Sequence, residues 1–160
     1  MERAVLKFTS SLATASTSDA CWKALQDMTF ETVGAKLFTV MTVDMARLEA
    51  KRAYTSDPVH YPVSGTKPIT FDSWFDVVHR QHRLFVANTL ADIALVFPDH
   101  ALIAALGCGA VVNLPILVAD KLVATINILH VAHYFTPERV AFIEHHLAGP
   151  SLAAYRKARA

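Results

Sequence analysis

The stretch 105–118 ends in a run rich in aliphatic and β-branched residues, and only the short polar connection Ala119-Asp120-Lys121 separates it from a second such run at 122–130. This pattern predicts an antiparallel β-hairpin that is buried on at least one face. One asparagine stands inside each run, Asn113 in the first and Asn127 in the second. Because amides are depleted from strand interiors and costly to bury without a partner, the pair indicates a sheet face that lines a cavity. The hairpin is therefore the first place where we expect a binding site.

Three further strands are predicted on the N-terminal side of the hairpin. Residues 37–43 are apolar or threonine with little alternation, which is typical of a central strand covered on both faces. Residues 49–56 alternate less cleanly and fit an edge strand, and a short strand is expected at 84–88. Residues 57–68 contain three prolines and one glycine, which predict a long ordered loop. Loops of this length in a compact domain often carry function.

Capping residues predict a helix near each end of the chain. The polar pair at 18–19 can cap a helix with an apolar stripe, and residues 1–15 before it are either a loose lead-in or a weak helix. Near the C-terminus, Thr136 is placed to cap a helix whose first position is Pro137. We expect this last helix to be kinked at 149–150 and to resume beyond it.

Two more helices are predicted in the middle of the chain. One begins after the capping pair at 72–73 and carries apolar residues in its first turns. The other covers about 98–106, with Phe97 and Leu102 as its apolar anchors. Both lie between predicted strands, so they are expected to cover the sheet.

Composition limits both the architecture and the function. Of the 160 residues 53% are hydrophobic and 18% are charged, which suffices for one core and is too little for two ordinary domains, so we expect one domain over residues 1–160. The formal net charge is +1 without a stripe of Lys or Arg, which disfavours nucleic-acid binding. No apolar run approaches the roughly 20 residues that cross a bilayer, and the N-terminus lacks a signal-peptide core. We therefore expect a soluble cytoplasmic protein without membrane attachment.

Cysteine and histidine give little indication of redox or metal chemistry. Cys21 and Cys108 do not form a metal-type CxxC pair and are expected to be free thiols. Cys21 fits a packed helix position, whereas Cys108 stands between two glycines at the start of the hairpin, where its thiol can face the cavity. His79 and His82 are spaced to share a helix face, but no third or fourth ligand joins them, so no metal site is predicted.

Several motifs in the second half of the chain together resemble a GAF domain. They are Leu106-Gly107-Cys108-Gly109, then Asn113-Leu114-Pro115-Ile116 and Val123-Ala124-Thr125-Ile126-Asn127, and finally Tyr134-Phe135-Thr136-Pro137-Glu138-Arg139 followed by a helix. The order of the predicted elements agrees over most of the chain, although Ala124 stands where the family usually has glycine. The resemblance implies an α+β, GAF-like (PAS/profilin-like) fold with a central antiparallel sheet of five to six strands. Terminal helices would pack on one face of that sheet, and ligand-pocket helices and loops on the other.

The resemblance also places the candidate binding residues. Alternation puts residues two apart in the hairpin on the same sheet face, and the resemblance makes one of these faces the ligand side. The covering elements would supply walls and lid contacts, and Arg52 is the nearest fixed cation for an acidic ligand. For each of these residues, structural packing is the alternative role. The full ligand-binding set is Thr39, Met41, Arg52, Tyr54, Trp74, Asp92, Cys108, Val111, Asn113, Asn127 and Leu129.

GAF domains are mostly small-molecule sensors, and a few are enzymes. We expect a stand-alone sensor that binds a small metabolite or anion, forms a homodimer through its terminal helices and acts through a separate signalling partner. No cofactor and no catalytic residue are assigned. The alternatives are an interaction module without a ligand and a thiol-dependent enzyme similar to the free methionine-(R)-sulfoxide reductases. Where those reductases carry a glutamate and two aspartates, the matching residues here are Val111, Asn127 and Leu129, which disfavours that activity.

Overall fold

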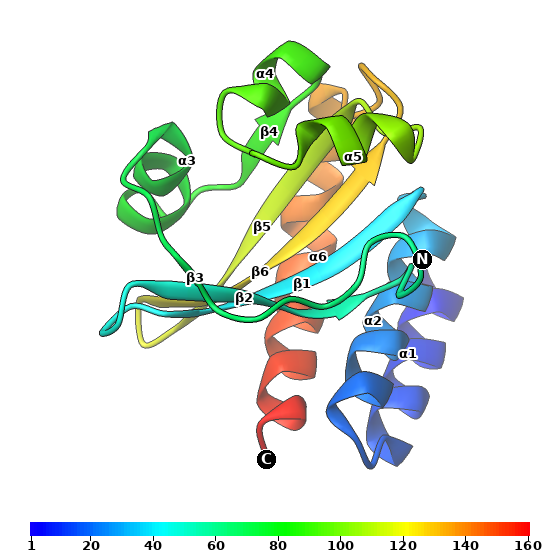
Figure 1. Ribbon diagram of the computed structural model, residues 1–160. Coiled ribbons are helices and arrows are strands. Elements are labelled where there is room, and N and C mark those ends of the chain that lie inside the picture. The colour runs from blue at the N-terminus through cyan, green and yellow to red at the C-terminus, as the bar shows by residue number, and fades with distance from the viewer.

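The computed structural model describes residues 1–160 and centres on a six-stranded antiparallel sheet (Figure 1). The strands lie in the order β3-β2-β1-β6-β5-β4. The predicted central position of β1 is confirmed, and β2 is an edge strand except where the two residues of β3 cover it. The strand bounds are β1 Leu37–Asp44, β2 Glu49–Thr55, β3 Lys67–Pro68, β4 Phe85–Ala87, β5 Ala110–Val118 and β6 Lys121–His130.

The helices form two groups that cover opposite faces of the sheet (Figure 1). One face carries the terminal helices, and the other carries four short helical segments together with the loop between β2 and β3. This confirms the predicted mixed architecture with terminal helices on one side. No helix combines the length and the apolar character that a membrane crossing requires. The terminal helices are α1 Glu2–Thr14, α2 Ser18–Thr32 and α6 Pro137–Ala158, and the others are α3 Ser73–Phe75, the π-helical turn η1 Asp76–Arg80, α4 Leu90–Ala94 and α5 His100–Ala105.

The hairpin of β5 and β6 forms as the sequence predicts. Its connection is the two-residue turn Ala119-Asp120, and both residues have positive φ, 50° and 60°. A two-residue turn with positive φ at both positions matches the right-handed twist of the flanking strands. The resulting register places Asn113 directly opposite Asn127.

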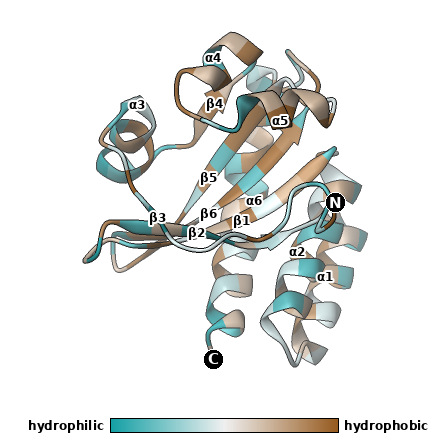
Figure 2. Ribbon diagram, viewed as in Figure 1, coloured by the Kyte–Doolittle hydropathy of each residue, from teal (hydrophilic) through white to brown (hydrophobic).

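The main hydrophobic core lies between the sheet and the terminal helices. Alternate residues of β5 and β6, among them Val112, Leu114, Ile126 and Ile128, are buried there against α2 and α6. The residues between them in sequence project to the opposite face of the sheet. Figure 2 shows that hydrophobic residues dominate these two strands, with a hydrophilic band across both. The band marks the polar part of the second face.

The structure changes several details of the predicted helices. Residues 2–14 are helical, so the alternative of a loose lead-in is wrong. The helix expected over 98–106 is shorter, and its buried anchor is Ile103, whereas Leu102 is 41% exposed. The last helix does resume beyond Pro150, as predicted, and runs to Ala158, because the turns on both sides of the proline bury side chains in the core.

The helix caps follow the sequence closely. Asp72 and Thr136 are confirmed as caps, each accepting a hydrogen bond from the backbone N–H three residues further on. The cap of α2 is Thr17, one residue before the predicted pair, and it accepts from the N–H of Ala20. A side-chain oxygen at each position satisfies one of the backbone donors that a helix start leaves free.

Candidate functional site

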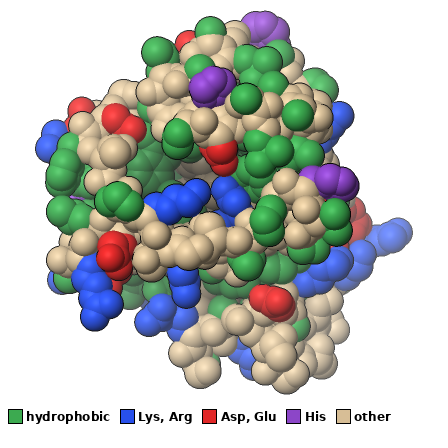
Figure 3. All heavy atoms as spheres, in the orientation of Figure 1, with side chains coloured by type: hydrophobic (Ala, Val, Ile, Leu, Met, Phe, Trp, Pro, Cys, Tyr) green, Lys and Arg blue, Asp and Glu red, His purple; other side chains and the backbone are tan.

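A cavity of about 260 Å³ lies on the sheet face opposite the terminal helices. Its floor is formed by β1, β5 and β6, and its walls come from the β2–β3 loop, from α3 and from the segment 96–99 before α5. Figure 3 shows this face hollowed, with hydrophobic side chains around the hollow and basic side chains within it. The cavity is therefore apolar in most of its wall and carries a few polar and charged groups, as small-molecule sites do.

The floor of the cavity consists of residues that strand alternation predicts. Six of the candidate residues lie there, and Trp74 from α3 and Arg52 from β2 also line the cavity. The structure thus brings eight of the predicted residues to one site. The six floor residues are Thr39, Met41, Val111, Asn113, Asn127 and Leu129.

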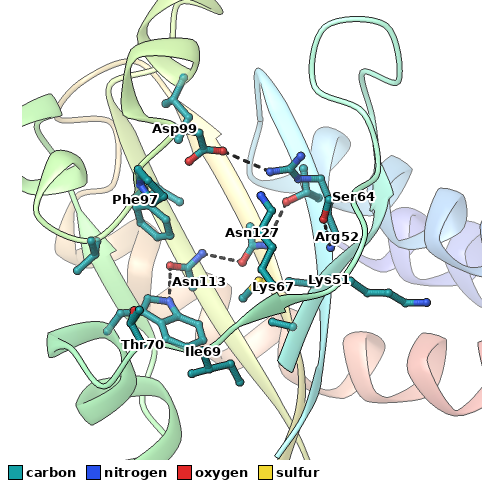
Figure 4. Close-up of a pocket in the computed structure, with 18 of the residues that line it drawn as sticks. Lys51, Arg52, Ser64, Lys67, Ile69, Thr70, Phe97, Asp99, Asn113 and Asn127 are labelled. Carbon is teal, nitrogen blue, oxygen red and sulfur yellow. Dashed lines mark hydrogen bonds and ion pairs between the residues drawn. The ribbon is translucent and has the colours of Figure 1, made fainter. Parts of the chain in front are cut away.

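The polar residues of the floor form one continuous hydrogen-bonded chain (Figure 4). The indole Nε1–H of Trp74 donates to Oδ1 of Asn113 at 3.0 Å, and Nδ2 of Asn113 donates to Oδ1 of Asn127 at 2.6 Å. Nδ2 of Asn127 then donates to Oγ1 of Thr39 at 3.0 Å, and the hydroxyl of Thr125 donates to the same Asn127 oxygen at 2.9 Å. Buried amides need partners of this kind to offset their desolvation.

Arg52 ties the covering loop to the other wall of the cavity. Its guanidinium donates to the carbonyl of Pro62 at 2.7 Å and pairs with the carboxylate of Asp99 at 3.3 Å (Figure 4). It also lies 3.6 Å from the ring centroid of Tyr61, whose hydroxyl donates to the same carboxylate of Asp99. Burial raises the pKa of the Tyr61 hydroxyl well above its ordinary value, and the neighbouring Asp99 raises it further. Tyr61 is therefore a neutral donor at physiological pH.

Tyr61 and Asp99 line the cavity, and sequence reasoning missed both. Both lie outside regular strands, so no periodicity marks them, and their partners are 38 and 47 residues away in sequence. The only available signal was the length of the loop at 57–68, which was predicted to be ordered and functional.

Two lysines reach the same part of the sheet edge but differ in direction. Both residues border the cavity. The side chain of Lys67 on β3 points into the cavity, whereas that of Lys51 on β2 points away from it (Figure 4). Lys67 has no ion pair in the structure. Of the acidic groups in the lining, Asp99 is paired with Arg52, and Asp72 accepts from the N–H of Phe75 and from the hydroxyl of Thr70.

Three predicted residues do not line the cavity. Tyr54 faces the terminal helices, where its hydroxyl donates to Oε1 of Gln26 at 2.7 Å and burial raises its pKa to about 12. Asp92 is exposed on α4, so it is neither a wall nor a lid contact. Cys108 is buried in an apolar cluster with Ile93 and Ile103 and does not itself line the cavity, and burial raises the pKa of its thiol. The expectation that its thiol faces the cavity is wrong.

The histidines do not assemble into a metal centre. His79 lies in η1, whereas His82 follows the end of that turn with a positive φ of 53°, so the two do not continue one helix face. No group of three or more His, Cys, Asp or Glu side chains is placed to hold a metal ion.

Comparison with known proteins gives matches only at the level of structure. No family model matches the sequence, and no curated protein matches it. A solved GAF domain of a two-component sensor histidine kinase from Bacillus halodurans is similar over 91% of this chain and 97% of its own, with a TM-score of 0.71 and 15% identity. The GAF domain of a phosphoenolpyruvate-protein phosphotransferase from Coxiella burnetii is similar over 99% and 96%, with a TM-score of 0.69 and 16% identity.

An enzyme has a similar structure as well. The free methionine-R-sulfoxide reductase from Neisseria meningitidis, solved in complex with its substrate, is similar over 99% of this chain and 93% of its own, with a TM-score of 0.64 and 14% identity. At such identities the likeness concerns the fold and leaves the activity open. The sheet order, the two groups of helices and these structural neighbours together show that the chain has the GAF fold.

Proposed function

We propose that this domain binds a small molecule in the cavity and serves as a sensor or regulatory domain. The observation that carries the proposal is the buried chain of side-chain hydrogen bonds on the cavity floor. Asn113 is only 2% exposed, yet it and its partners face a hollow and not the apolar core. A mostly apolar cavity with a few convergent polar groups is the usual form of a ligand site.

We also propose that the signal passes to a separate partner and that the domain forms a homodimer through its terminal helices in the cytoplasm. The apolar residues that α1 leaves exposed support the dimer, with Leu6 at 70% exposure as the clearest example. Val5 and Phe30 add exposed apolar surface on α1 and α2. Exposed apolar surface on packed helices favours association with another apolar surface.

A sulfoxide reductase is the competing function, and the geometry does not favour it. Thiol chemistry requires an accessible thiolate. Both cysteines are buried, neither lines the cavity, and burial raises the pKa of both thiols. Two of the three positions where those enzymes carry carboxylates are the apolar Val111 and Leu129.

Native mass spectrometry and thermal-shift screening test the proposed function. A retained small molecule, or a saturable stabiliser among nucleotides, amino acids, keto acids and anions, is the expected result. A ligand that binds only the folded state adds about 2.7 kcal/mol at a hundredfold excess over its dissociation constant. The oligomeric state is read from the same native spectra, and a monomer at all concentrations would reject the proposed dimer.

A pair of variants shows whether the stabiliser occupies the cavity. Asn127→Leu and Gln26→Leu each remove a hydrogen-bonded amide, but Gln26 lies on the opposite side of the sheet with Tyr54. Both variants are expected to lose stability, and only Asn127→Leu should lose the response to the ligand. An equal loss of response in both, or a wild-type protein that no compound stabilises, would reject a cavity-bound ligand.

A further inference from the structure

We propose, on the basis of the small-molecule site argued above, that its ligand is an oxyanion, and specifically a carboxylate carried on a small apolar body. The carboxylate is held by the ammonium group of Lys67 and by the side-chain N–H of Asn127, and the apolar body lies between Trp74 and Phe97. Three features of the cavity carry this assignment: the direction of its hydrogen bonds, the charge of Lys67 and its walls.

The direction of the hydrogen-bond chain is set at Trp74. An indole N–H can only donate, so the amide of Asn113 must present its oxygen to Trp74. Its nitrogen then faces Asn127 and donates to Oδ1 of that residue. The nitrogen of Asn127 in turn donates to Thr39. Every bond in the chain therefore points the same way, and each donor polarises the next.

This direction of the hydrogen-bond chain leaves mainly hydrogen-bond donors available to a ligand. The Asn127 oxygen already accepts two hydrogen bonds, from Asn113 and from Thr125, whereas its nitrogen uses only one of its two hydrogens. Asn113 and Thr39 are each 2% exposed, and Asn127 is partly exposed. Asn127 is thus the polar floor residue that a ligand can contact, and it offers a donor. A ligand atom at this position has to be an acceptor.

The charge of Lys67 has the sign that an anionic acceptor needs. Lys67 points into the cavity without an ion pair (Figure 4), while Arg52 and Asp99 neutralise each other. Asp72 is engaged as the cap of α3. A cationic ligand would be repelled by Lys67, and both oxygens of the Asp72 carboxylate are already occupied by hydrogen bonds from Phe75 and Thr70. A carboxylate can pair directly with the Lys67 ammonium through charge-assisted hydrogen bonds, which are stronger than neutral ones.

The walls determine the rest of the ligand. Trp74, Phe97, Val96 and Ile69 give the cavity an apolar wall surface beside the polar wall residues Arg52, Ser64 and Asp99, so an apolar part of the ligand can pack against Trp74 and Phe97. The volume of about 260 Å³ lies below the usual range for drug-sized ligands, of roughly 300 to 1,000 Å³. A single ring or a short branched chain fits this space better than a nucleotide does.

Three ring compounds of nearly equal shape test the charge preference: benzoate, benzamide and benzamidine. Binding is measured by titration with NMR observation of the side-chain amide signals of Asn113 and Asn127 and the indole signal of Trp74, with inorganic phosphate as a fourth probe. Benzoate is expected to bind most tightly and to shift the Asn127 amide signals. Lys67→Gln should weaken the binding of benzoate by about three- to tenfold, as expected for a partly exposed ion pair, and leave the binding of benzamide unchanged. Lys51→Gln, which removes a charge pointing away from the cavity, is the matched control and should have no effect on either probe.

The outcomes separate this inference from the proposed function. Tighter binding of benzamide or benzamidine than of benzoate would overturn the carboxylate assignment while leaving a cavity that binds small molecules. If phosphate bound more tightly than benzoate, the assignment of an apolar body to the ligand would be wrong. Equal losses of benzoate affinity in the Lys67 and Lys51 variants would show that Lys67 does not hold the carboxylate. No binding of any probe at millimolar concentration would overturn the inference, and the proposed function would fail only if the metabolite screen also gave no stabiliser.

Discussion

Arg52 and Tyr54 are two residues apart on β2 and yet project to opposite faces of the sheet. Tyr54 pairs with Val40, but the next residue of β1, Met41, pairs with Arg52, so Ala53 is left without a partner. One extra residue in a strand is a β-bulge, and it reverses the facing of the residues beyond it. The bulge delivers Arg52 to the cavity and Tyr54 to the terminal helices, where it bonds Gln26.

The first prediction concerns the stability that Tyr54 contributes. Tyr54→Phe removes the donor to Gln26 and leaves a buried amide oxygen without its partner. Such a loss costs about 1–3 kcal/mol, measured as the free energy of unfolding in urea at pH 7. Binding of benzoate in the cavity should not change, because Tyr54 lies on the other face. A variant as stable as the wild type would show that the bond contributes nothing.

The same variant should change how stability depends on pH. The folded state raises the pKa of Tyr54 to about 12, mainly by burial, from about 10 in the unfolded chain. The folded state thus favours the protonated hydroxyl, and this contribution is complete below pH 10 and is lost as the pH rises from about 10 to 12. The free energies of unfolding of the wild type and of Tyr54→Phe should therefore become more similar as the pH rises through that window. A constant difference between the two free energies would contradict the raised pKa.

How far the sequence predicts this site depends on how regular each strand is. In β5 and β6 the residues 111, 113, 127 and 129 keep strict alternation, so reading every second residue finds the cavity floor. In β2 the same reasoning fails at Tyr54, because nothing in the composition of Glu49–Thr55 indicates the bulge. Asp92 fails for a related reason, since it lies in a short helix whose orientation is set by tertiary packing.

Sequence periodicity cannot predict contacts between residues that lie on separate loops. Tyr61 and Asp99 meet Arg52 only because the β2–β3 loop folds across the cavity toward the start of α5. The fold as a whole was predictable because it rests on local signals: the hairpin turn, the caps at Asp72 and Thr136, and the apolar spacing of the terminal helices. The cavity floor follows from these signals, and its covering does not.

The second prediction is that Cys108 contributes packing alone. The residue is 3% exposed and lies among Ile93, Ile103 and Val111, and burial raises the pKa of its thiol, with a smaller opposing effect from Lys36. Both cysteines of the native protein should react slowly with a thiol reagent at pH 8, and both should react at once in urea. Cys108→Ser places a hydroxyl in an apolar cluster and should cost about 1–3 kcal/mol without changing benzoate affinity. Fast labelling of native Cys108 would show an accessible thiol and contradict this role.

The third prediction tests whether Trp74 sets the direction of the hydrogen-bond chain. Trp74→Phe keeps an aromatic wall but deletes the N–H that fixes the amide of Asn113. The buried Asn113 oxygen then lacks its donor, which should cost about 1–3 kcal/mol, and the amide is free to turn. The preference for benzoate over benzamide should therefore decrease.

Trp22→Phe is the control for that prediction. Trp22 is buried in the core on the other side of the sheet, so the variant loses packing but keeps every hydrogen bond of the cavity floor. Its preference for benzoate should equal that of the wild type. If Trp74→Phe also kept the full preference, the indole would not determine the polarity of the floor.

The last prediction is that Arg52 holds the β2–β3 loop in place over the cavity. Arg52→Gln removes the hydrogen bond to Pro62 and the ion pair with Asp99, and the cation over the Tyr61 ring is lost. Hydrogen exchange at the backbone N–H groups of Tyr61 and Ser64 should become roughly tenfold faster, which corresponds to about 1.4 kcal/mol of local stability. Arg47→Gln is the matched control, because Arg47 only pairs with exposed Asp44 at 3.8 Å. Exchange in β1 and β6 should be unaffected in both variants. If the loop exchanged at the wild-type rate in Arg52→Gln, the loop would be held by its own packing and not by Arg52.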